Sequence, residues 1–189
     1  MPQELWLIRH GETEWSRSGA HTGRTDLPLT GAGRENAAAL GRRLHGRRFS
    51  LVLTSPLQRA VDTCRLAGYG DAAQVEPNLY EWNYGDYEGR TTTDIQKERP
   101  GWSLWTDGVP NGESIAQVAA RADAVLTRAL PSDGDVALFA HGHILRVLTA
   151  RWLGLDADCG RLFALGTASV SVLGYERETR VIKQWNVSA

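Results

Sequence analysis

A short segment near the N-terminus joins residue types that can do chemistry on a phosphate. The apolar run 5–8 leads directly into Arg9, His10 and Gly11. The planar guanidinium of arginine matches the oxygens of phosphate or carboxylate, and histidine can act as a nucleophile or a base near neutral pH. Because glycine has no Cβ, Gly11 is expected to keep the path of a ligand clear. The segment therefore predicts a place where a phosphorylated ligand is bound and attacked.

Three later segments add groups that suit the same chemistry. Arg59 lies in the first turn of a helix that the Ser-Pro pair at 55–56 is expected to start. His141 follows the apolar run 136–140, and Glu81 lies between a tyrosine and a tryptophan. Aromatic neighbours are expected to shield this carboxyl group from water and so favour its protonated form. Two arginines can neutralise a phosphate monoester of about −2 charge, while a carboxylic acid can protonate the leaving oxygen.

These groups stand at the ends of expected strands. The runs 5–8, 51–54 and 136–140 have the composition of buried strands and alternate with helical patterns. This alternation predicts an α/β fold, a three-layer α-β-α sandwich. Two further strands at 168–173 and 180–185 are expected to form a hairpin, so the central sheet should be mixed and mostly parallel. The helices after 51–54 and 136–140 are expected to aim their first amides at one anion beyond the sheet.

The chain of 189 residues has the length of one domain, and we expect residues 1–189 to form it. Residues 82–113 are rich in glycine and proline and are expected to form a lid or pocket wall with a brief helix at 93–98. The stretch 11–29 has no periodicity and is expected to be a loop. Ser114 and the residues after it have the form of a capping box that starts a long helix.

Composition limits the classes of partner. A formal charge of −1 without a basic block argues against binding to nucleic acid or to an anionic membrane. Cys64 and Cys159 lack metal-ligand spacing and are expected to be reduced. No stretch is long enough to span a bilayer, and no signal peptide is recognisable, so we expect a cytoplasmic protein. The sequence leaves open whether the chain forms a homo-oligomer.

Taken in order, these segments resemble the histidine phosphatase superfamily, in its phosphoglycerate mutase-like branch. The resemblance covers nearly the whole chain and rests on the segments 9–13, 23–30, 55–59, 79–85, 112–114 and 141–142. It implies that His10 accepts the phosphoryl group and that Glu81 donates a proton to the leaving group. It further implies that the phosphate is held by Arg9, Arg59 and His141.

Details within these segments look most like sugar bisphosphatases, such as those acting on sedoheptulose bisphosphate, and like broad acid phosphatases. Similarity to sugar-phosphate phosphatases implies additional substrate-binding residues, namely Thr22, Gly23, Tyr84, Gly142 and Arg146. The expected partner is a small phosphorylated metabolite, and the sequence does not choose the physiological substrate.

Three alternatives remain open from the sequence. Glu113, which follows Asn-Gly, could be the acid in place of Glu81. A cofactor-dependent phosphoglycerate mutase is the second alternative, and a non-catalytic phosphate-binding protein is a more remote one. Mutases of this family carry Gly-Glu-Arg-His-Tyr-Gly around the acid and a longer chain, whereas this chain has Tyr-Glu-Trp-Asn-Tyr-Gly at 80–85. We therefore favour a phosphatase.

A metal-dependent reaction is not expected. His141 and His143 could bind zinc, but a third clear ligand is missing, and Arg9 beside His10 would repel a cation. We expect no metal and no cofactor, because guanidinium groups can neutralise the phosphate.

Overall fold

The fold is built on a mixed sheet of six strands. The structure, a computed structural model, describes residues 3–44 and 46–188. The strands are β1 (Leu5–Arg9), β2 (Leu51–Thr54), β3 (Ala73–Val75), β4 (Val136–Ala140), β5 (Ser169–Glu176) and β6 (Thr179–Ser188). Their order is β3-β2-β4-β1-β5-β6, with parallel pairing from β3 to β1 and antiparallel pairing of β5 with both β1 and β6. The predicted mixed, mostly parallel sheet and its C-terminal hairpin are confirmed.

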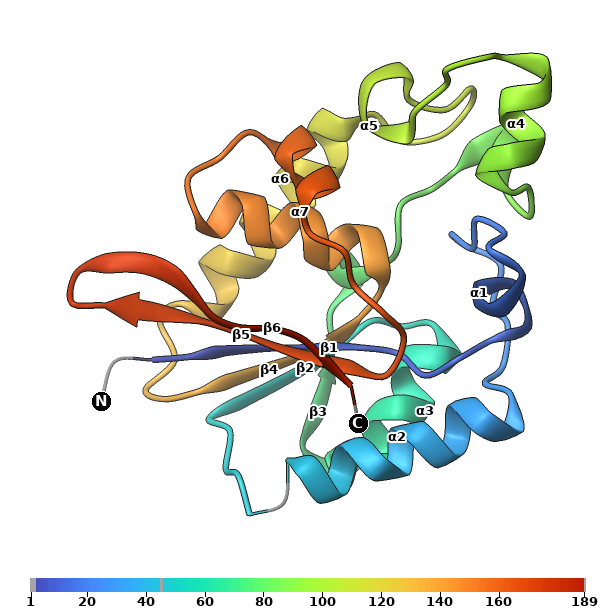
Figure 1. The fold of residues 1–189 in the computed structure, drawn as a ribbon. Coiled ribbons are helices and arrows are strands. Elements are labelled where there is room, and N and C mark those ends of the chain that lie inside the picture. Colours follow the sequence, from blue (N-terminus) through green and yellow to red (C-terminus); the bar gives the residue numbers. More distant parts are fainter. Residues whose placement is uncertain (1–2, 45, 189) are drawn as a thin grey trace.

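Helices cover both faces of this sheet (Figure 1). They are α1 (Glu14–Ser18), α2 (Gly31–Arg43), α3 (Gln58–Leu66), α4 (Thr92–Glu98), α5 (Leu104–Asp107), α6 (Ile115–Ala129) and α7 (Gly142–Trp152). Short 3-10 turns lie at Gly70–Ala72, Pro77–Leu79, Gly85–Tyr87 and Ala157–Leu162. Helices α2 and α3 pack on one face and α6 and α7 on the other, which confirms the three-layer sandwich (Figure 1).

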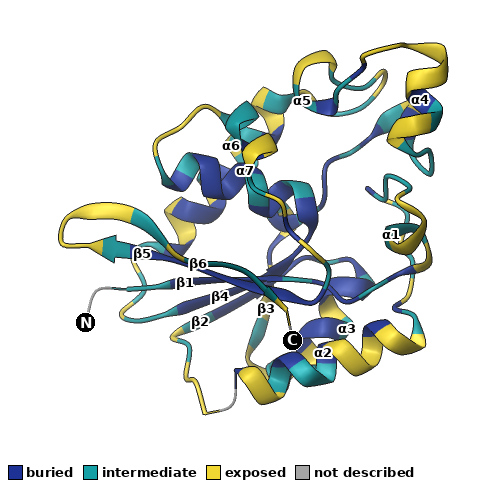
Figure 2. Ribbon diagram, viewed as in Figure 1, coloured by how far each residue is buried: buried dark blue, intermediate teal, exposed yellow. Residues whose placement is uncertain are grey.

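Alternation along β1 assigns its side chains to two cores. Leu5 and Leu7 belong to the core shared with α6 and α7, whereas Trp6 and Ile8 belong to the core on the α2 and α3 side. Successive side chains of a strand point to opposite faces, so a strand covered on both faces needs an unbroken apolar run. Figure 2 shows the central strands and the inward faces of the helices buried, whereas the edge strands β3 and β6 and the outer faces of the helices are intermediate or exposed.

Helix α6 begins as the sequence predicts. The hydroxyl of Ser114 accepts from the backbone N–H of Gln117 at 3.3 Å, and the backbone N–H of Ser114 donates to the Gln117 side chain at 2.8 Å. This capping box satisfies two amides of the first turn. The helix then buries one face against the sheet, through Val118, Ala122, Val125 and Ala129.

The stretch 11–29 was expected to be a loop, but it contains the five-residue helix α1. A capping box between Thr13 and Ser16 starts this helix, and it is too short to show hydrophobic periodicity. The segment after α1 joins the excursion 82–113 by backbone hydrogen bonds: the N–H of His21 donates to the Arg90 carbonyl at 2.9 Å, and the N–H of Gly89 donates to the His21 carbonyl at 2.8 Å. The two segments therefore lie side by side.

The turn after β1 is held by close packing against α2. A Cβ built on Gly11 would lie 2.4 Å from the Gly33 carbonyl oxygen, and one on Gly33 would lie 2.1 Å from the Glu12 carbonyl oxygen. The expectation that Gly11 clears space for a ligand is therefore wrong, because its missing Cβ makes room for α2. The N–H of Thr30 also donates to the Glu12 carbonyl at 2.9 Å. Helix α2 thus fixes the backbone beside His10.

We predict that Gly33→Ala lowers the free energy of unfolding by about 2 kcal/mol, because its Cβ meets backbone rather than a movable side chain. Gly31→Ala on the same helix is the control. Nothing lies within 4 Å of its built Cβ, so stability should be unchanged or higher by up to about 1 kcal/mol. Urea unfolding followed by circular dichroism measures both. Equal stabilities of the two variants would contradict the close packing.

Candidate active site

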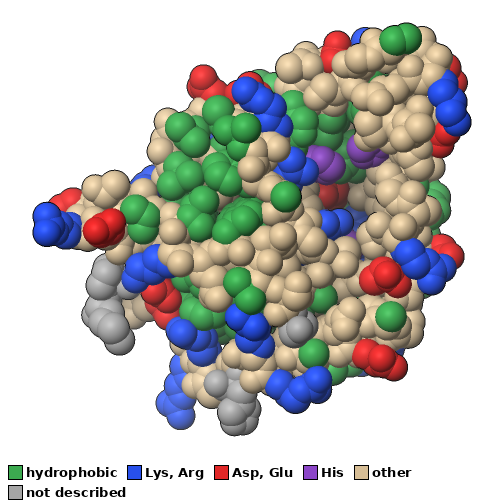
Figure 3. All heavy atoms as spheres, in the orientation of Figure 1, with side chains coloured by type: hydrophobic (Ala, Val, Ile, Leu, Met, Phe, Trp, Pro, Cys, Tyr) green, Lys and Arg blue, Asp and Glu red, His purple; other side chains and the backbone are tan. Residues whose placement is uncertain are grey.

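A cleft of about 450 Å³ lies beyond the carboxyl ends of β1 and β4. Its wall combines Arg9, His10 and Glu81 with residues from α1, α4, α5 and α7. Figure 3 shows this hollow, with histidine, acidic and basic side chains grouped inside it. The position agrees with the rule that open α/β sheets bind ligands beyond the carboxyl ends of their strands.

His10 is buried at the end of β1 and presents one ring nitrogen to the cleft. Its Nδ1 lies 2.6 Å from the Gly11 carbonyl oxygen. A carbonyl only accepts hydrogen bonds, so Nδ1 carries the proton and the neutral ring keeps a lone pair on Nε2. Burial, and then the nearby charges of Arg9 and Arg59, hold the pKa of His10 well below its usual range. The imidazole is therefore neutral at pH 7 and able to act as a nucleophile.

Arg9 offers an unused donor in the cleft. Its NH1 group donates to the Leu165 carbonyl, whereas its buried Nε has no hydrogen-bond partner among the described residues. Gly142 lies against this guanidinium, since a Cβ built there would be 3.3 Å from Arg9 Cζ. The N–H of Gly142 is the first of α7 and has no acceptor within the helix. The NH2 group of Arg9 also donates no hydrogen bond among the described residues, so an anion in the cleft can accept from this guanidinium and from the Gly142 N–H.

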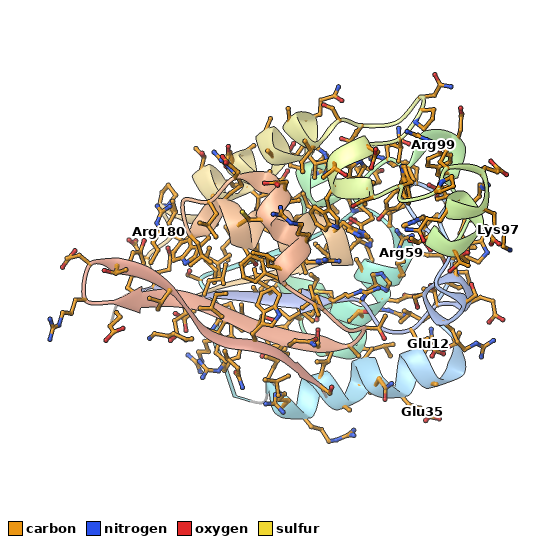
Figure 4. All side chains as sticks on the ribbon, turned by 45° about the horizontal axis from the view of Figure 1, so that its top comes forward. Glu12, Glu35, Arg59, Lys97, Arg99 and Arg180 are labelled. Carbon is orange, nitrogen blue, oxygen red and sulfur yellow. The ribbon has the colours of Figure 1, made fainter. Side chains whose placement is uncertain are left out.

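Arg59 and His141 lie behind His10 and are fully buried, not on the cleft wall. The Nε–H of Arg59 donates to His141 Nδ1 at 3.1 Å, and the other nitrogen of that ring lies 2.7 Å from the Ser55 hydroxyl. The ring centroids of His10 and His141 are 5.1 Å apart. The structure thus brings the predicted arginine and histidine together with His10, and Figure 4 shows Arg59 extending from α3 toward the middle of the molecule.

Helix α3 does not direct its first amides at the cleft, which corrects a prediction from the sequence. The helix begins at Gln58, and the N–H of this residue donates to Asp26 Oδ1 at 2.8 Å. No side chain caps the helix: the Ser55 hydroxyl contacts His141 and accepts, at 3.4 Å, from the N–H of Leu57, which precedes the first turn. Of the two helices expected to face the anion, only α7 presents a free N-terminal amide there.

Glu81 lines the cleft and is fixed by backbone amides. Its carboxylate accepts from the N–H groups of His143 at 2.9 Å, Ile144 at 3.0 Å and Trp82 at 2.9 Å. The sequence-based expectation of a carboxyl group merely shielded by aromatic rings is therefore incomplete. Two of the three donors belong to the first turn of α7, so the same helix end positions Glu81 and borders Arg9.

Glu113, the alternative acid, lies outside the cleft wall. Arg121 donates to both of its carboxylate oxygens, at 2.8 and 2.9 Å, and the N–H of Asn83 donates at 2.8 Å. Arg121 also reaches the carbonyl oxygens of Asn78 and Tyr80. Glu113 therefore ties the Glu81 segment to α6 and supports the acid that faces the cleft.

The other predicted binding residues divide into two groups. Thr22, Tyr84, Gly142 and Arg146 line the cleft, whereas Gly23 does not. The Gly23 carbonyl instead accepts from Arg59 at 2.8 Å, and its N–H donates to Glu88 at 2.8 Å. The excursion 82–113 supplies Tyr84 together with Trp102 and Trp105, so it forms part of the wall.

Sequence reasoning missed His21. This residue lies in the cleft wall with its ring centroid 4.8 Å from that of Tyr84 and 5.8 Å from that of Trp102. Burial lowers the pKa of His21, against an opposing effect of Glu88. No pattern marked it, because it follows α1 in a stretch without periodicity. Its backbone pairing with Arg90 and Gly89 is visible only in the folded chain.

No group of three or more histidine, cysteine, aspartate or glutamate side chains in the described residues is arranged to hold a metal ion. Within the same part of the chain, no helix combines the length and apolarity needed to cross a membrane.

Comparison with known proteins places this site in a family. The pattern of the histidine phosphatase superfamily (branch 1) matches residues 5–188. The chain therefore belongs to the histidine phosphatase superfamily, as the resemblance of its motifs indicated.

Two curated relatives and one solved structure are close in sequence. An acid phosphatase of Mycobacterium tuberculosis is 43% identical over 180 residues, which cover 93% of this chain and 88% of that protein. The sedoheptulose 1,7-bisphosphatase of Saccharomyces cerevisiae is 37% identical over 185 residues, or 80% and 68% of the two chains. The mycobacterial glucosyl-3-phosphoglycerate phosphatase in complex with VO3 superposes with a TM-score of 0.86 at 32% identity, covering 98% of this chain and 100% of that one.

The buried histidines predict how stability depends on pH. The pKa values of His10, His21, His141 and His143 are all lowered by burial. Below about pH 6.5 the unfolded chain takes up protons that the folded chain does not. The free energy of unfolding should therefore rise as the pH increases from 5 to 6.5 and level off above it, by at most about 1.4 kcal/mol per pH unit for each histidine.

Urea unfolding at pH 5.0, 5.5, 6.0, 6.5 and 7.5 measures this slope, in a range where most carboxylates stay ionised. His143→Gln, which keeps a polar group near Tyr84, should lower the slope. A flat or falling curve between pH 5 and 6.5 would contradict burial of the neutral rings.

Proposed function

We propose that this protein is a phosphatase that hydrolyses phosphomonoesters of small metabolites, sugar phosphates among them, through a phosphohistidine at His10. One observation carries the proposal: His10, which keeps an unprotonated Nε2, lines a cleft together with the Arg9 guanidinium, whose NH2 group donates no hydrogen bond among the described residues. A nucleophile beside an unused cationic donor fits the attack on a bound phosphate. Relatives named as phosphatases support this reaction class.

In the first step the substrate phosphate accepts from the Arg9 guanidinium and from the Gly142 N–H. The Nε2 lone pair of His10 attacks phosphorus in line with the leaving oxygen. The P–O bond breaks, and the alcohol takes the proton of a protonated Glu81. The Gly11 carbonyl retains the proton on Nδ1 and so stabilises the phosphorylated ring.

In the second step water attacks the phosphohistidine. The Glu81 carboxylate takes a proton from this water, the P–N bond breaks, and its electron pair returns to Nε2. Inorganic phosphate leaves, and both His10 and Glu81 regain their starting states. No divalent ion is needed for charge neutralisation, because Arg9 and Arg59 supply fixed positive charge.

Arg59 and His141 support the phosphate site from behind. Four of the five N–H groups of Arg59 are bound, to His141 and to the carbonyls of Thr22, Gly23 and Thr25, which leaves one on NH1 for a phosphate oxygen. His141 is neutral, since burial and the charge of Arg59 hold its pKa well below the usual range. We assign direct phosphate contact to that N–H of Arg59 and a positioning role to His141.

The cellular setting is part of the proposal. Cys64 and Cys159 are both free thiols, and free thiols are typical of a reducing compartment, which supports action in the cytoplasm. Burial raises the pKa of Cys64 to about 12, so this thiol packs as an apolar group.

We predict that His10→Asn lowers kcat for sugar-phosphate hydrolysis by at least about 10³-fold, because the covalent route is lost. Wild-type protein quenched during turnover of a 32P-labelled sugar phosphate should carry an acid-labile, base-stable label. The variant should carry none while it retains the wild-type circular dichroism spectrum. A label on another residue, or an unchanged rate, would exclude His10 as the nucleophile.

Two further assays test a phosphoglycerate mutase and a metal-dependent reaction. With 3-phosphoglycerate and a bisphosphoglycerate primer, a hydrolase should form little 2-phosphoglycerate compared with the free phosphate it releases from sugar phosphates. Efficient isomerisation with negligible phosphate release would identify a mutase instead. Activity should also survive excess chelator. Loss of activity in chelator that a divalent ion restores would show that the reaction depends on a metal.

A substitution pair tests the acid. Glu81→Gln should lower kcat/KM for a sugar phosphate by about 10²- to 10⁴-fold, but for p-nitrophenyl phosphate by less than about tenfold, because nitrophenolate leaves without protonation. The kcat/KM ratio is the right quantity, since it reports only the steps up to release of the alcohol. Glu113→Gln is the matched control and should affect both substrates alike. If Glu113→Gln lowers kcat/KM for the sugar phosphate far more than for p-nitrophenyl phosphate, and Glu81→Gln affects both alike, then Glu113 is the acid.

A further inference from the structure

The charged side chains of the cleft are concentrated around the phosphate site. Arg9, Glu81 and Arg146 are the ionisable residues of its wall besides His10, His21, His143 and Tyr84. All three are tied to the first turns of α7: Gly142 lies against the Arg9 guanidinium, Glu81 accepts from the N–H groups of His143 and Ile144, and Arg146 lies one turn further along the helix. Arg146 is fixed there by its Nε–H, which donates to the Gly160 carbonyl at 3.0 Å.

The opposite end of the cleft is neutral. Helices α1 and α4 and the segment before α5 contribute Ser16, Gln96, Trp102 and Ser103 to the wall, and none of these is charged. Trp105 of α5 lies where the two ends meet, because the Arg146 guanidinium is 4.7 Å from its ring centroid. Gln96 donates to the Trp102 carbonyl at 2.9 Å, which directs its side-chain amide along this wall.

Cations close by in the sequence do not line the cleft. Lys97 pairs with Asp94 at 2.7 Å, and Arg90 pairs with Glu98 at 2.7 Å. Figure 4 shows Lys97 at the outer edge of α4. His21 and His143 add no positive charge at neutral pH, because burial lowers the pKa values of both.

Two aromatic rings of the wall are held rigidly, Trp102 at the neutral end and Trp105 where the two ends meet. The Trp102 Nε1–H donates to the Gly108 carbonyl at 2.9 Å, and the ring packs edge-on against His21. Trp105 packs so closely on Gly160 that a Cβ there would lie 2.7 Å from the indole, and the Arg146 guanidinium lies 4.7 Å from its ring centroid. Fixed indole rings offer apolar surface to the C–H groups of a sugar, while Gln96 and Ser103 offer hydrogen bonds to its hydroxyls.

We infer that this enzyme selects phosphomonoesters whose remaining part is neutral and hydroxylated, namely monophosphates of sugars and polyols, over bisphosphates and phosphorylated carboxylic acids. The inference rests on the proposed phosphatase activity and concerns the same site. A second phosphate or a carboxylate at the neutral end would lose water without gaining a cation, which disfavours its binding. A neutral hydroxylated group carries no such penalty there.

Matched substrate pairs test this selectivity. Wild-type kcat/KM should be at least about tenfold higher for fructose 6-phosphate than for fructose 1,6-bisphosphate, and for glycerol 3-phosphate than for 3-phosphoglycerate. Phosphate release from p-nitrophenyl phosphate is measured in parallel. No release from any of these substrates overturns the proposed function itself. Release with equal or reversed rates within each pair leaves the phosphatase standing and overturns only the selectivity.

A pair of lysine substitutions on α4 locates the selectivity. Gln96→Lys adds a cation to the neutral end and should raise kcat/KM for the bisphosphate, relative to the monophosphate, by about five- to tenfold. Thr93→Lys adds the same charge at an exposed position of α4 that is not part of the wall, and its ratio should stay at the wild-type value. Equal ratios in the two variants would overturn the assignment of selectivity to this end of the cleft.

Discussion

The hydrogen bond between His10 Nδ1 and the Gly11 carbonyl determines what the rest of the site can do, because it decides which ring nitrogen faces the cleft. The backbone around this bond is fixed from several sides. The N–H of His10 donates to the Ala140 carbonyl at 3.0 Å, and its carbonyl accepts from the N–H of Ala168 at 2.9 Å. The N–H of Gly11 donates to Thr63 Oγ1 on α3 at 3.0 Å. Contacts with β4, with the residue before β5 and with α3 thus hold the nucleophile in place before any ligand binds.

The arginines keep their charge available because they are bound by carbonyl oxygens. Arg59 donates to the carbonyls of Thr22, Gly23 and Thr25, and Arg9 donates to that of Leu165. A carbonyl satisfies an N–H group but cancels no net charge, whereas a carboxylate would do both. Among the described residues neither arginine forms a salt bridge. The site therefore keeps a positive potential that is available to a phosphate.

The sequence predicts the parts of this molecule that depend on local pattern. The strand β1 follows from an unbroken apolar run, and its last residues carry the chemistry in Arg9 and His10. The role of Gly11 was misjudged because its partner Gly33 is 22 positions away in the sequence, and such contacts leave no local pattern. Helix α1 and His21 were missed for a related reason, since short capped turns and loop residues lack periodicity.

The choice between the two glutamates shows the same limit. Glu81 has aromatic neighbours, whereas Glu113 follows Asn-Gly and precedes the start of a helix, but neither setting decides which carboxyl group faces the ligand. The folded chain separates them by their partners. Both carboxylate oxygens of Glu113 accept from Arg121, and Glu113 does not line the cleft. Glu81 instead accepts from backbone amides of α7 and faces the cleft. A side chain eight residues further along the chain thus decides which acid is free to act.

The two ends of the cleft come from different parts of the fold. The charged end is built on β1, β4 and α7, whose backbones are tied into the sheet or begin directly after it. The neutral end is built on α1, α4 and the segment before α5, which belong to segments inserted after β1 and before α6. Substitutions in the inserted segments can change which group is accepted without moving Arg9, His10 or Glu81. Such a division allows one phosphate site to serve different substrates, because reaction chemistry and substrate choice depend on separate residues.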